Sequence, residues 1–184
     1  MVNRMIKNNI GRISVISGLL ITAGVLVGCQ GMAQGSRQKA SAHLESRSGS
    51  KTTGEVNFVS QGKDVLVTGK FSGLKPNSEH GFHVHEKGDC SSADATSAGG
   101  HFNPDGKAHG MPGSSAHHAG DMPNIKADAA GNANYSAKLN GFAVNTGSNG
   151  IVGKSVVIHR DPDDYKSQPA GNSGPRIACG LIRS

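Results

Sequence analysis

The sequence predicts an all-β domain, an antiparallel sandwich or flattened barrel of about eight strands. Short segments alternate apolar and polar residues with the period of two that is typical of a strand with one buried face. No segment shows sustained helical periodicity with end caps. The 27 glycines, the lack of Trp and an aromatic content of 4% indicate a core of Val, Ile, Leu and Ala, connected by many turns.

The predicted strands are separated by turn-forming segments. Residues 61–64 and 128–132 have the Gly, Asn and Asp content of tight turns. The chain length allows one domain and a short tail after a leader. The strands are expected around residues 40–44, 56–58, 65–71, 80–86, 133–139, 151–159 and 177–182.

Residues 1–28 have the composition of an export signal. Three basic residues and no acidic ones accompany an apolar run that is too short for a comfortable membrane span. The run ends in Leu26-Val27-Gly28-Cys29, which resembles a bacterial lipoprotein signal, where the cysteine becomes the lipidated first residue. An uncleaved N-terminal anchor is the alternative interpretation.

This leader defines the expected organisation of the chain. We expect a lipoprotein signal peptide at residues 1–28, a flexible tether at residues 29–38 and one folded domain at residues 39–184. The mature protein would be exported and held by a lipid on Cys29 in the bacterial cell envelope, at the membrane surface or in the periplasm.

The charge balance does not favour a nucleic-acid partner. Removing the three basic leader residues from the 19 Lys and Arg leaves 16, against 13 Asp and Glu, so the mature net charge is +3. No run of like charge is dense, and the aromatic side chains that stack on bases are nearly absent. We therefore exclude nucleic-acid binding as a function.

The three cysteines are an odd number until one of them is assigned to lipid. With Cys29 lipidated, Cys90 and Cys179 remain, and an exported protein occupies an oxidising compartment. We therefore expect a disulfide between Cys90 and Cys179. Two separate buried thiols are the alternative.

A long irregular segment carries four of the nine histidines. Residues 87–124 are rich in Gly, Ser, Ala, Pro and His, and form a predicted loop about three times as long as an ordinary connection. A loop of that length is either disordered or held in place. Its histidines are spread along the segment and do not form a tract, which favours ligands that hold the loop in place over a solvated His-rich linker.

The ligand types indicate two adjacent metal ions. His83 and His85 project to the same side of a strand, with backbones roughly 7 Å apart, and His159 ends another strand. Imidazole donors alone suit copper. Three imidazoles and one carboxylate are a closed tetrahedral zinc set, and the loop supplies them as His101, His109, His118 and Asp121. From ligand types alone, a hydrolase with two zinc ions stays open.

Four motifs together strongly resemble the copper/zinc superoxide dismutases, in particular the bacterial secreted lipoprotein type. The resemblance extends from Gly54 to Ile182 with motif order and spacing intact. It implies a Greek-key antiparallel sandwich, or flattened eight-stranded barrel, with long metal-binding and electrostatic loops. The motifs are Gly81-Phe82-His83-Val84-His85-Glu86, Gly99-Gly100-His101-Phe102-Asn103-Pro104, His118-Ala119-Gly120-Asp121 and Gly174-Pro175-Arg176-Ile177-Ala178-Cys179-Gly180.

The resemblance also assigns the ligands of one copper and one zinc ion per subunit. It implies copper ligands His83, His85, His101 and His159, and zinc ligands His101, His109, His118 and Asp121, with His101 as the bridge. The spacing to the Gly-Asp pair selects His118 over the adjacent His117, while His43 and His80 match no motif position.

Two further residues acquire roles through the same resemblance. Asp163 falls where the family keeps a carboxylate that joins a copper histidine to a zinc histidine, here His83 and His109, with Asp161 and Asp164 as alternatives. Arg176 matches the arginine beside the copper, which receives a small anion, whereas a buried structural salt bridge is its other interpretation.

The implied activity is dismutation of superoxide to dioxygen and hydrogen peroxide, which would protect the cell envelope from extracytoplasmic superoxide. Arg176 and the bridging His101 are the expected catalytic residues. The alternative is a copper- and zinc-binding envelope protein of the same fold that stores or transfers metal with little turnover. Residues 160–175 depart from the family's guiding pattern, because acidic side chains accompany Lys166. A homodimer stays open, because relatives use different dimer surfaces or none.

Overall fold

The computed structural model describes residues 37–145 and 147–184. The predicted signal peptide, the lipidated Cys29 and all but the last two residues of the predicted tether lie outside these described residues. Within them, no helix is long and apolar enough to cross a membrane.

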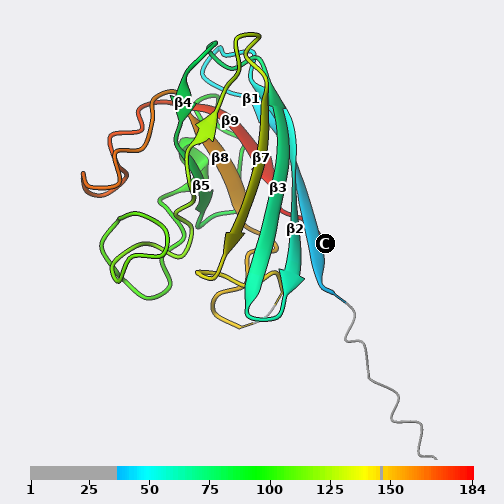
Figure 1. Cartoon of the computed structure of the whole chain (residues 1–184), viewed down its shortest axis with the longest axis vertical. Helices are drawn as coiled ribbons and strands as arrows, with labels where there is room; N and C mark the ends of the chain where they lie inside the picture. Colours follow the sequence, from blue (N-terminus) through cyan, green and yellow to red (C-terminus); the bar gives the residue numbers. More distant parts are fainter. Residues whose placement is uncertain (1–36, 146) are drawn as a thin grey trace, which may run out of the picture. The chain divides into compact units, whose positions relative to one another are not determined.

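The described chain is built from nine strands and one short 3-10 helix (Figure 1). All strand pairings are antiparallel. The elements are β1 (Lys39–Ser46), β2 (Thr53–Gln61), β3 (Asp64–Ser72), β4 (Glu79–His80), β5 (Phe82–His85), η1 (Thr96–Ala98), β6 (Ile125–Lys126), β7 (Ala133–Leu139), β8 (Ser155–His159) and β9 (Arg176–Leu181).

Seven strands form one sheet in the order β5-β8-β9-β1-β2-β3-β7, and β4 pairs with β6 beside it. The large sheet curls around the core, as Figure 1 shows, so the structure confirms the predicted all-β, barrel-like class. Strand β9 lies between β8 and β1, and this brings the C-terminal segment into the middle of the sheet beside the first strand. Connections of this kind between distant segments are typical of Greek-key sheets.

The period-two pattern explains which side chains reach the core. In β1, the buried residues Ala40, Ala42 and Leu44 alternate with exposed ones. On one face of the curled sheet, the Phe82 ring packs edge-on against the rings of Phe71 and Tyr135, with centroids 5.4 Å and 5.1 Å away. Five consecutive residues of β8 are buried, so this strand is covered on both faces.

The strand predicted at residues 80–86 is two strands. It is interrupted at Gly81, whose N–H donates to the Asp161 carbonyl and whose carbonyl accepts from His159 N–H. On either side of this point, β4 pairs with β6 and β5 pairs with β8. The strand predicted at residues 151–159 is also shorter, since β8 begins at Ser155. Propensity alone cannot place such a break, because it depends on the neighbouring strands.

The long loop between β5 and β6 is held along an edge of β5. Val84 N–H donates to the Gly120 carbonyl, while the Val84 carbonyl accepts from Phe102 N–H. Isolated bridges also pair His83 with Asp121 and His85 with His101. The loop therefore covers the free edge of the strand, and each bridge brings two of the predicted ligands together.

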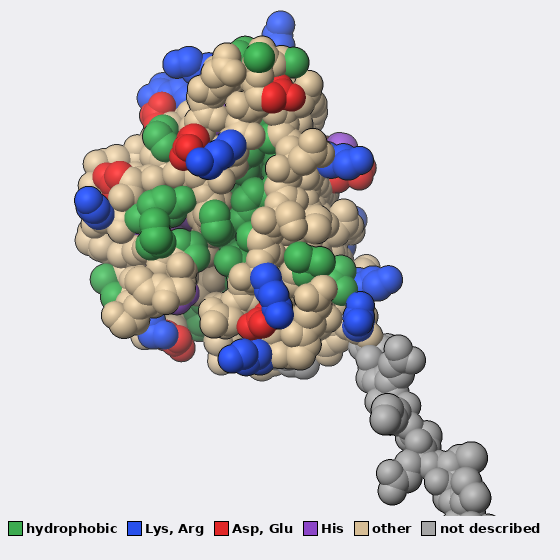
Figure 2. Space-filling model, in the orientation of Figure 1, with side chains coloured by type: hydrophobic (Ala, Val, Ile, Leu, Met, Phe, Trp, Pro, Cys, Tyr) green, Lys and Arg blue, Asp and Glu red, His purple; other side chains and the backbone are tan. Residues whose placement is uncertain are grey.

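The Cys90–Cys179 disulfide is present, which confirms that prediction, and it ties this loop to β9. The two cysteines are separated by 89 residues. Basic and acidic side chains are scattered mostly towards the edge of the face shown in Figure 2, hydrophobic side chains gather in its middle, and little histidine surface is visible. The histidines of the predicted ligand groups are almost entirely inside the molecule.

Candidate metal centre

The seven predicted ligand residues form two compact groups of four that share one residue. Within each group, one candidate ligand atom per residue lies within 4.8 Å of the others, and every residue is buried. The first group is His83, His85, His101 and His159, and the second is His101, His109, His118 and Asp121. The structure thus brings together every residue that the sequence predicts as a ligand.

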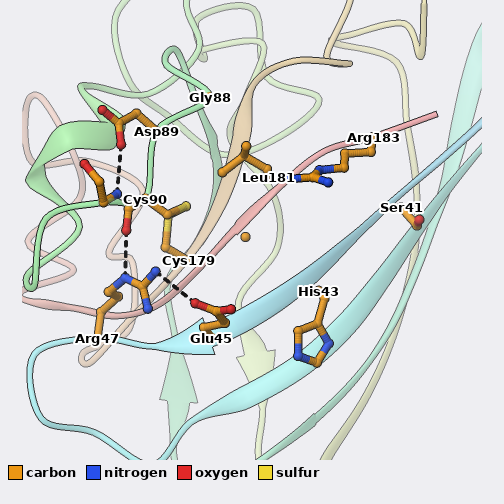
Figure 3. Close-up of a pocket in the computed structure, with 12 residues that line it drawn as sticks. Ser41, His43, Glu45, Arg47, Gly88, Asp89, Cys90, Cys179, Leu181 and Arg183 are labelled. Carbon is orange, nitrogen blue, oxygen red and sulfur yellow. Dashed lines mark hydrogen bonds and ion pairs between the residues drawn. A yellow bond between two sulfur atoms is a disulfide. The ribbon is translucent and has the colours of Figure 1, made fainter.

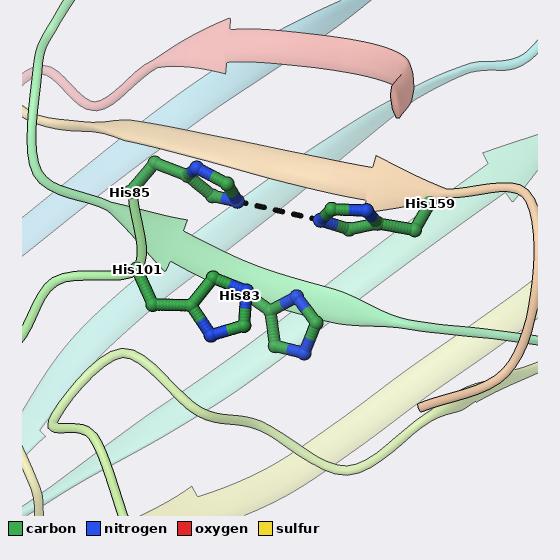
Figure 4. Close-up of side chains that lie close together, drawn as sticks. All are labelled: His83, His85, His101 and His159. Carbon is green, nitrogen blue, oxygen red and sulfur yellow. Dashed lines mark hydrogen bonds between the residues drawn. The ribbon is translucent and has the colours of Figure 1, made fainter. Parts of the chain in front are cut away.

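The elements of the sheet determine the first group. His83 and His85 both lie on β5, and the antiparallel partner β8 ends at His159. The bridge between His85 and His101 adds the fourth ring from the long loop. In Figure 4 the four imidazoles face a common space between the strands.

Backbone carbonyls orient two rings of this group. His85 Nδ1 lies 3.0 Å from the Gly99 carbonyl oxygen, and His159 Nδ1 lies 3.1 Å from the Gly174 carbonyl oxygen. Because a carbonyl only accepts, both Nδ1 atoms must donate, and in the neutral rings both Nε2 atoms carry lone pairs. These two Nε2 atoms are 3.3 Å apart, the contact drawn in Figure 4. Two facing lone pairs repel each other, and a metal ion bound by both nitrogens would relieve that repulsion.

Four buried ring nitrogens have no hydrogen-bond partner in the described part of the chain. They are His83 Nδ1, His101 Nε2, His109 Nδ1 and His118 Nδ1. A buried polar atom without a partner is costly, and such atoms are rare in native proteins. Each group contains at least two of them, so both groups have the unsatisfied nitrogens expected of a metal site.

Burial keeps the histidines of the first group neutral. It lowers the pKa of His85 and His159 well below the ordinary value of 6.5, and the neighbouring rings lower it further. Burial and the nearby His83 also lower the pKa of His101 to about 3, although Asp121 opposes this. Neutral imidazoles are ready to bind a metal, and an all-nitrogen set suits copper.

The second group is organised around Asp121. Its Oδ1 lies 2.8 Å from His101 Nδ1, and its Oδ2 lies 3.0 Å from His109 Nδ1. Burial alone would raise the pKa of Asp121, but the hydrogen bond to His101 and the close contacts with His109 and His118 hold it far below its usual range. The carboxylate therefore stays ionised, and three nitrogens with one carboxylate oxygen fit zinc. His101 faces Asp121 with Nδ1, which leaves Nε2 for the first group.

Asp163 connects the two groups by bonding one histidine of each. Its Oδ2 accepts from His83 Nε2 at 2.8 Å, and its Oδ1 accepts from His109 Nε2 at 2.9 Å. The competing candidates point elsewhere, since Asp161 pairs with Arg160 and Asp164 bonds Ser167. Burial lowers the pKa of His109, but the close contact with the Asp121 carboxylate and the hydrogen bond to Asp163 outweigh this and raise it to about 9.

Gly171 allows the loop to pass close to this bridge. Its φ is +64°, a conformation that suits glycine, and a Cβ at this position would overlap Asp163 Oδ1. The Cβ would also stand 2.8 Å from His109 Nε2. Sequence reasoning had no signal for this requirement, because one glycine among 27 is not distinctive.

Arg176 lies at the open side of the first group. Its Nη1 donates to the Ala95 carbonyl at 2.7 Å and its Nη2 to the Gly99 carbonyl at 2.6 Å. Among the described residues it forms no salt bridge, which argues against a purely structural ion pair. A cavity of about 430 Å³ opens here, lined by Arg176, His85, His101, His118 and His159 together with Glu86, Gly100, Asn103, Pro169 and Ala170.

The remaining histidines lie outside both groups. His117 is partly exposed and bonds the Ser114 carbonyl, and His43 is exposed 3.9 Å from Glu55. His80, which matched no motif, is fully buried, and its Nδ1 lies 3.0 Å from the His159 carbonyl oxygen. Sequence reasoning also missed Asn124, whose side chain bonds both the N–H and the carbonyl of Asp163.

A larger cavity of about 590 Å³ lies away from both groups, between β1, β9 and the disulfide (Figure 3). Arg47 crosses it, donating to the Cys90 carbonyl at 2.9 Å and pairing with Glu45 at 3.2 Å. None of the predicted metal ligands lines this cavity. The metal chemistry therefore belongs to the smaller cavity at Arg176.

A curled antiparallel sheet with two buried ligand groups joined by one histidine defines a dinuclear β-barrel metalloprotein. The family model described as copper/zinc superoxide dismutase (SODC) matches residues 52–182. The chain belongs to the copper/zinc superoxide dismutase family. Its activity is superoxide dismutation, and its cofactors are copper and zinc.

Individual relatives agree with this membership. Superoxide dismutase [Cu-Zn] 2 of Aquifex aeolicus (strain VF5) is 45% identical over 150 residues, which cover 79% of this chain and 86% of the relative. Superoxide dismutase [Cu-Zn] of Paramecium bursaria Chlorella virus 1 is 44% identical over 70% of this chain and 71% of its own. The crystal structure of the clock protein EA4 superposes with a TM-score of 0.72 at 38% identity, covering 80% of this chain and 94% of that one.

Proposed function

We propose that His83, His85, His101 and His159 hold copper, that His101, His109, His118 and Asp121 hold zinc, and that His101 bridges the two. The observation that carries this assignment is the pair of ligand groups that share His101. The orphaned nitrogens in both groups support it, and so does the difference in donor sets, four nitrogens against three nitrogens and a carboxylate.

The site's own residues would position the substrate and a proton. When bound, copper supplies the one-electron redox couple and zinc a fixed positive charge, by which two superoxide ions and two protons become dioxygen and hydrogen peroxide. Arg176, fixed by two carbonyls, would receive the small anion in the cavity and offset its charge. Buried His101 Nε2 would hold a proton for the peroxide that forms whenever this nitrogen is not bound to copper.

Anomalous X-ray diffraction at the copper and zinc absorption edges tests the assignment directly. We expect copper scattering only in the first group and zinc scattering only in the second. The variant His159→Ala should lose copper and dismutation activity while it retains zinc. The variant His118→Ala should bind zinc more weakly than wild type. Retained activity in His159→Ala, measured by pulse radiolysis, would contradict the copper assignment. Stable metal binding without copper-dependent loss of superoxide would instead favour storage or transfer.

We also propose that the enzyme works outside the cytoplasm, attached to a bacterial membrane by a lipid on Cys29, and protects the envelope from superoxide. The lipobox-like sequence before Cys29 and the disulfide support an exported enzyme. Labelling of cells with a fatty acid tests this proposal. Wild-type protein should take up the label, and a Cys29→Ala variant that is still labelled would refute the anchor.

A further inference from the structure

The side chain of Gln168 forms two hydrogen bonds with the main chain of His109. Its Oε1 accepts from His109 N–H at 2.9 Å, and its Nε2 donates to the His109 carbonyl at 2.9 Å. The two residues are 59 positions apart, on the loops that follow β8 and β5. One amide therefore satisfies both backbone groups of a single histidine across two loops.

The orientation of this amide is determined by its partners. A backbone N–H only donates and a backbone carbonyl only accepts, so exchanging the oxygen and nitrogen of Gln168 would break both bonds. Two bonds to one residue also restrict translation and rotation of its backbone more than one bond does. The contact can therefore define where the His109 backbone lies.

The residues after Gln168 reach the substrate cavity. Pro169 and Ala170 line that cavity together with Arg176 and the histidines of the copper group. One residue further on, Gly171 passes against Asp163 Oδ1 and His109 Nε2. Gln168 and Gly171 thus contact His109 from its main chain and from its ring, and the cavity wall lies between these two contacts.

We propose that Gln168 is a positioning residue that joins the zinc ligand His109 to the wall of the substrate cavity, so that metal binding at His109 orders residues 168–170. This inference rests on the proposed zinc assignment of His109. Gln168 itself is exposed and touches no ligand nitrogen, so its effect is exerted through the His109 backbone.

The metal-dependent ordering can be measured without the activity of the enzyme. Metal-free protein is loaded with one equivalent of Co²⁺ or Zn²⁺, for wild type, Gln168→Leu and Gln168→Glu. Co²⁺ absorption bands report the ligand geometry, release of Zn²⁺ to a chelator reports its dissociation rate, and hydrogen exchange reports the order of residues 166–171. Gln38→Leu is the matched control, since Gln38 precedes β1 and contributes its carbonyl to Ser60 N–H.

We expect Gln168→Leu to release Zn²⁺ about tenfold faster than wild type, at the lower end of effects seen for groups behind metal ligands. Its Co²⁺ bands should shift, and metal should no longer slow exchange in residues 166–171 while it still protects residues 118–121. Gln168→Glu keeps the acceptor for His109 N–H, so its Zn²⁺ release rate should lie between those of wild type and Gln168→Leu. The control Gln38→Leu should match wild type in all three measurements.

Two outcomes overturn the proposal in different ways. If wild type gives no tetrahedral Co²⁺ spectrum, the zinc assignment itself is wrong and the inference falls with it. If wild type binds Co²⁺ but Gln168→Leu keeps the wild-type release rate and the metal-dependent protection, the zinc assignment stands and only the role of Gln168 is refuted.

Discussion

His85 and Arg176 donate to the same atom, the carbonyl oxygen of Gly99, at 3.0 Å and 2.6 Å. The first bond fixes which nitrogen of His85 carries the hydrogen, and the second holds the guanidinium at the edge of the cavity. One peptide group thus sets the geometry of a copper-group histidine and of the anion-binding arginine. Each should respond to a change at the other through Gly99.

Arg176→Ala should slow dismutation while both metals stay bound. We expect a loss of at least about tenfold, smaller than the roughly hundredfold typical of a buried oxyanion donor, because Arg176 is only half-buried and water screens its charge. Pulse radiolysis with metal analysis of the same sample measures this. Arg183→Ala, at an exposed arginine just after β9, is the control and should change neither quantity. Loss of copper from Arg176→Ala would show a structural role instead.

Asp163→Asn should weaken zinc binding about 10- to 100-fold, the range seen when the partner of a metal ligand is removed. The amide can accept from only one of the two Nε2–H groups of His83 and His109, and it turns its NH₂ towards the other. Competition with a chelator gives the affinity. Asp164→Asn is matched in chemistry and lies in an exposed turn, so it should bind zinc as wild type does. Equal zinc affinity in both variants would show that Asp163 does not support zinc binding.

Gly171→Ala should reproduce the zinc defect of Asp163→Asn, because the added Cβ displaces the carboxylate from His109. Its matched control is Gly62→Ala. Gly62 has a similar φ of +67°, but a Cβ added there would meet nothing within 4 Å. Both variants incur the backbone cost of about 1 kcal/mol at positive φ, which thermal unfolding measures. Only Gly171→Ala should also lose zinc affinity, so wild-type affinity there would contradict the proposed close approach.

The two ligand groups could be predicted from the sequence because only a few types of side chain bind metal ions, and their positions and spacing can be read directly from it. His83 and His85 appear as a strand pair, and Asp121 follows His118 by three residues. Strand alternation likewise predicts β1, because its buried side chains face one core. These features depend on local pattern and ligand chemistry, which a sequence displays directly.

The supporting contacts could not be predicted in the same way. Asn124 holds the backbone of Asp163 from 39 residues away, and His80 bonds the carbonyl of His159 from 79 residues away. Each contact exists because strands distant in sequence pair in the sheet, as β5 does with β8. The break at Gly81 has the same origin, since two different strands pair on either side of it.

The metal-free protein should lose stability as the pH rises from 6.5 to 9. His109 has a folded pKa of about 9, above its ordinary value of 6.5, because Asp121 and Asp163 outweigh the effect of burial. A group whose pKa is raised on folding contributes stability that is complete below its unfolded pKa and is lost as the pH rises through its folded pKa. For His109 that window lies between pH 6.5 and about 9.

The histidines of the first group affect the pH dependence of stability only at lower pH. Burial lowers the pKa of His85 and His159, so their contribution is complete above pH 6.5 and is lost only as the pH falls. Denaturant unfolding of chelated protein between pH 6.5 and 9 therefore isolates His109. We expect a falling free energy of unfolding in wild type, and a lower but flat profile in His109→Gln. Zinc-loaded wild type should also be flat, because the metal replaces the proton, and a decline that persists in His109→Gln would place its origin elsewhere.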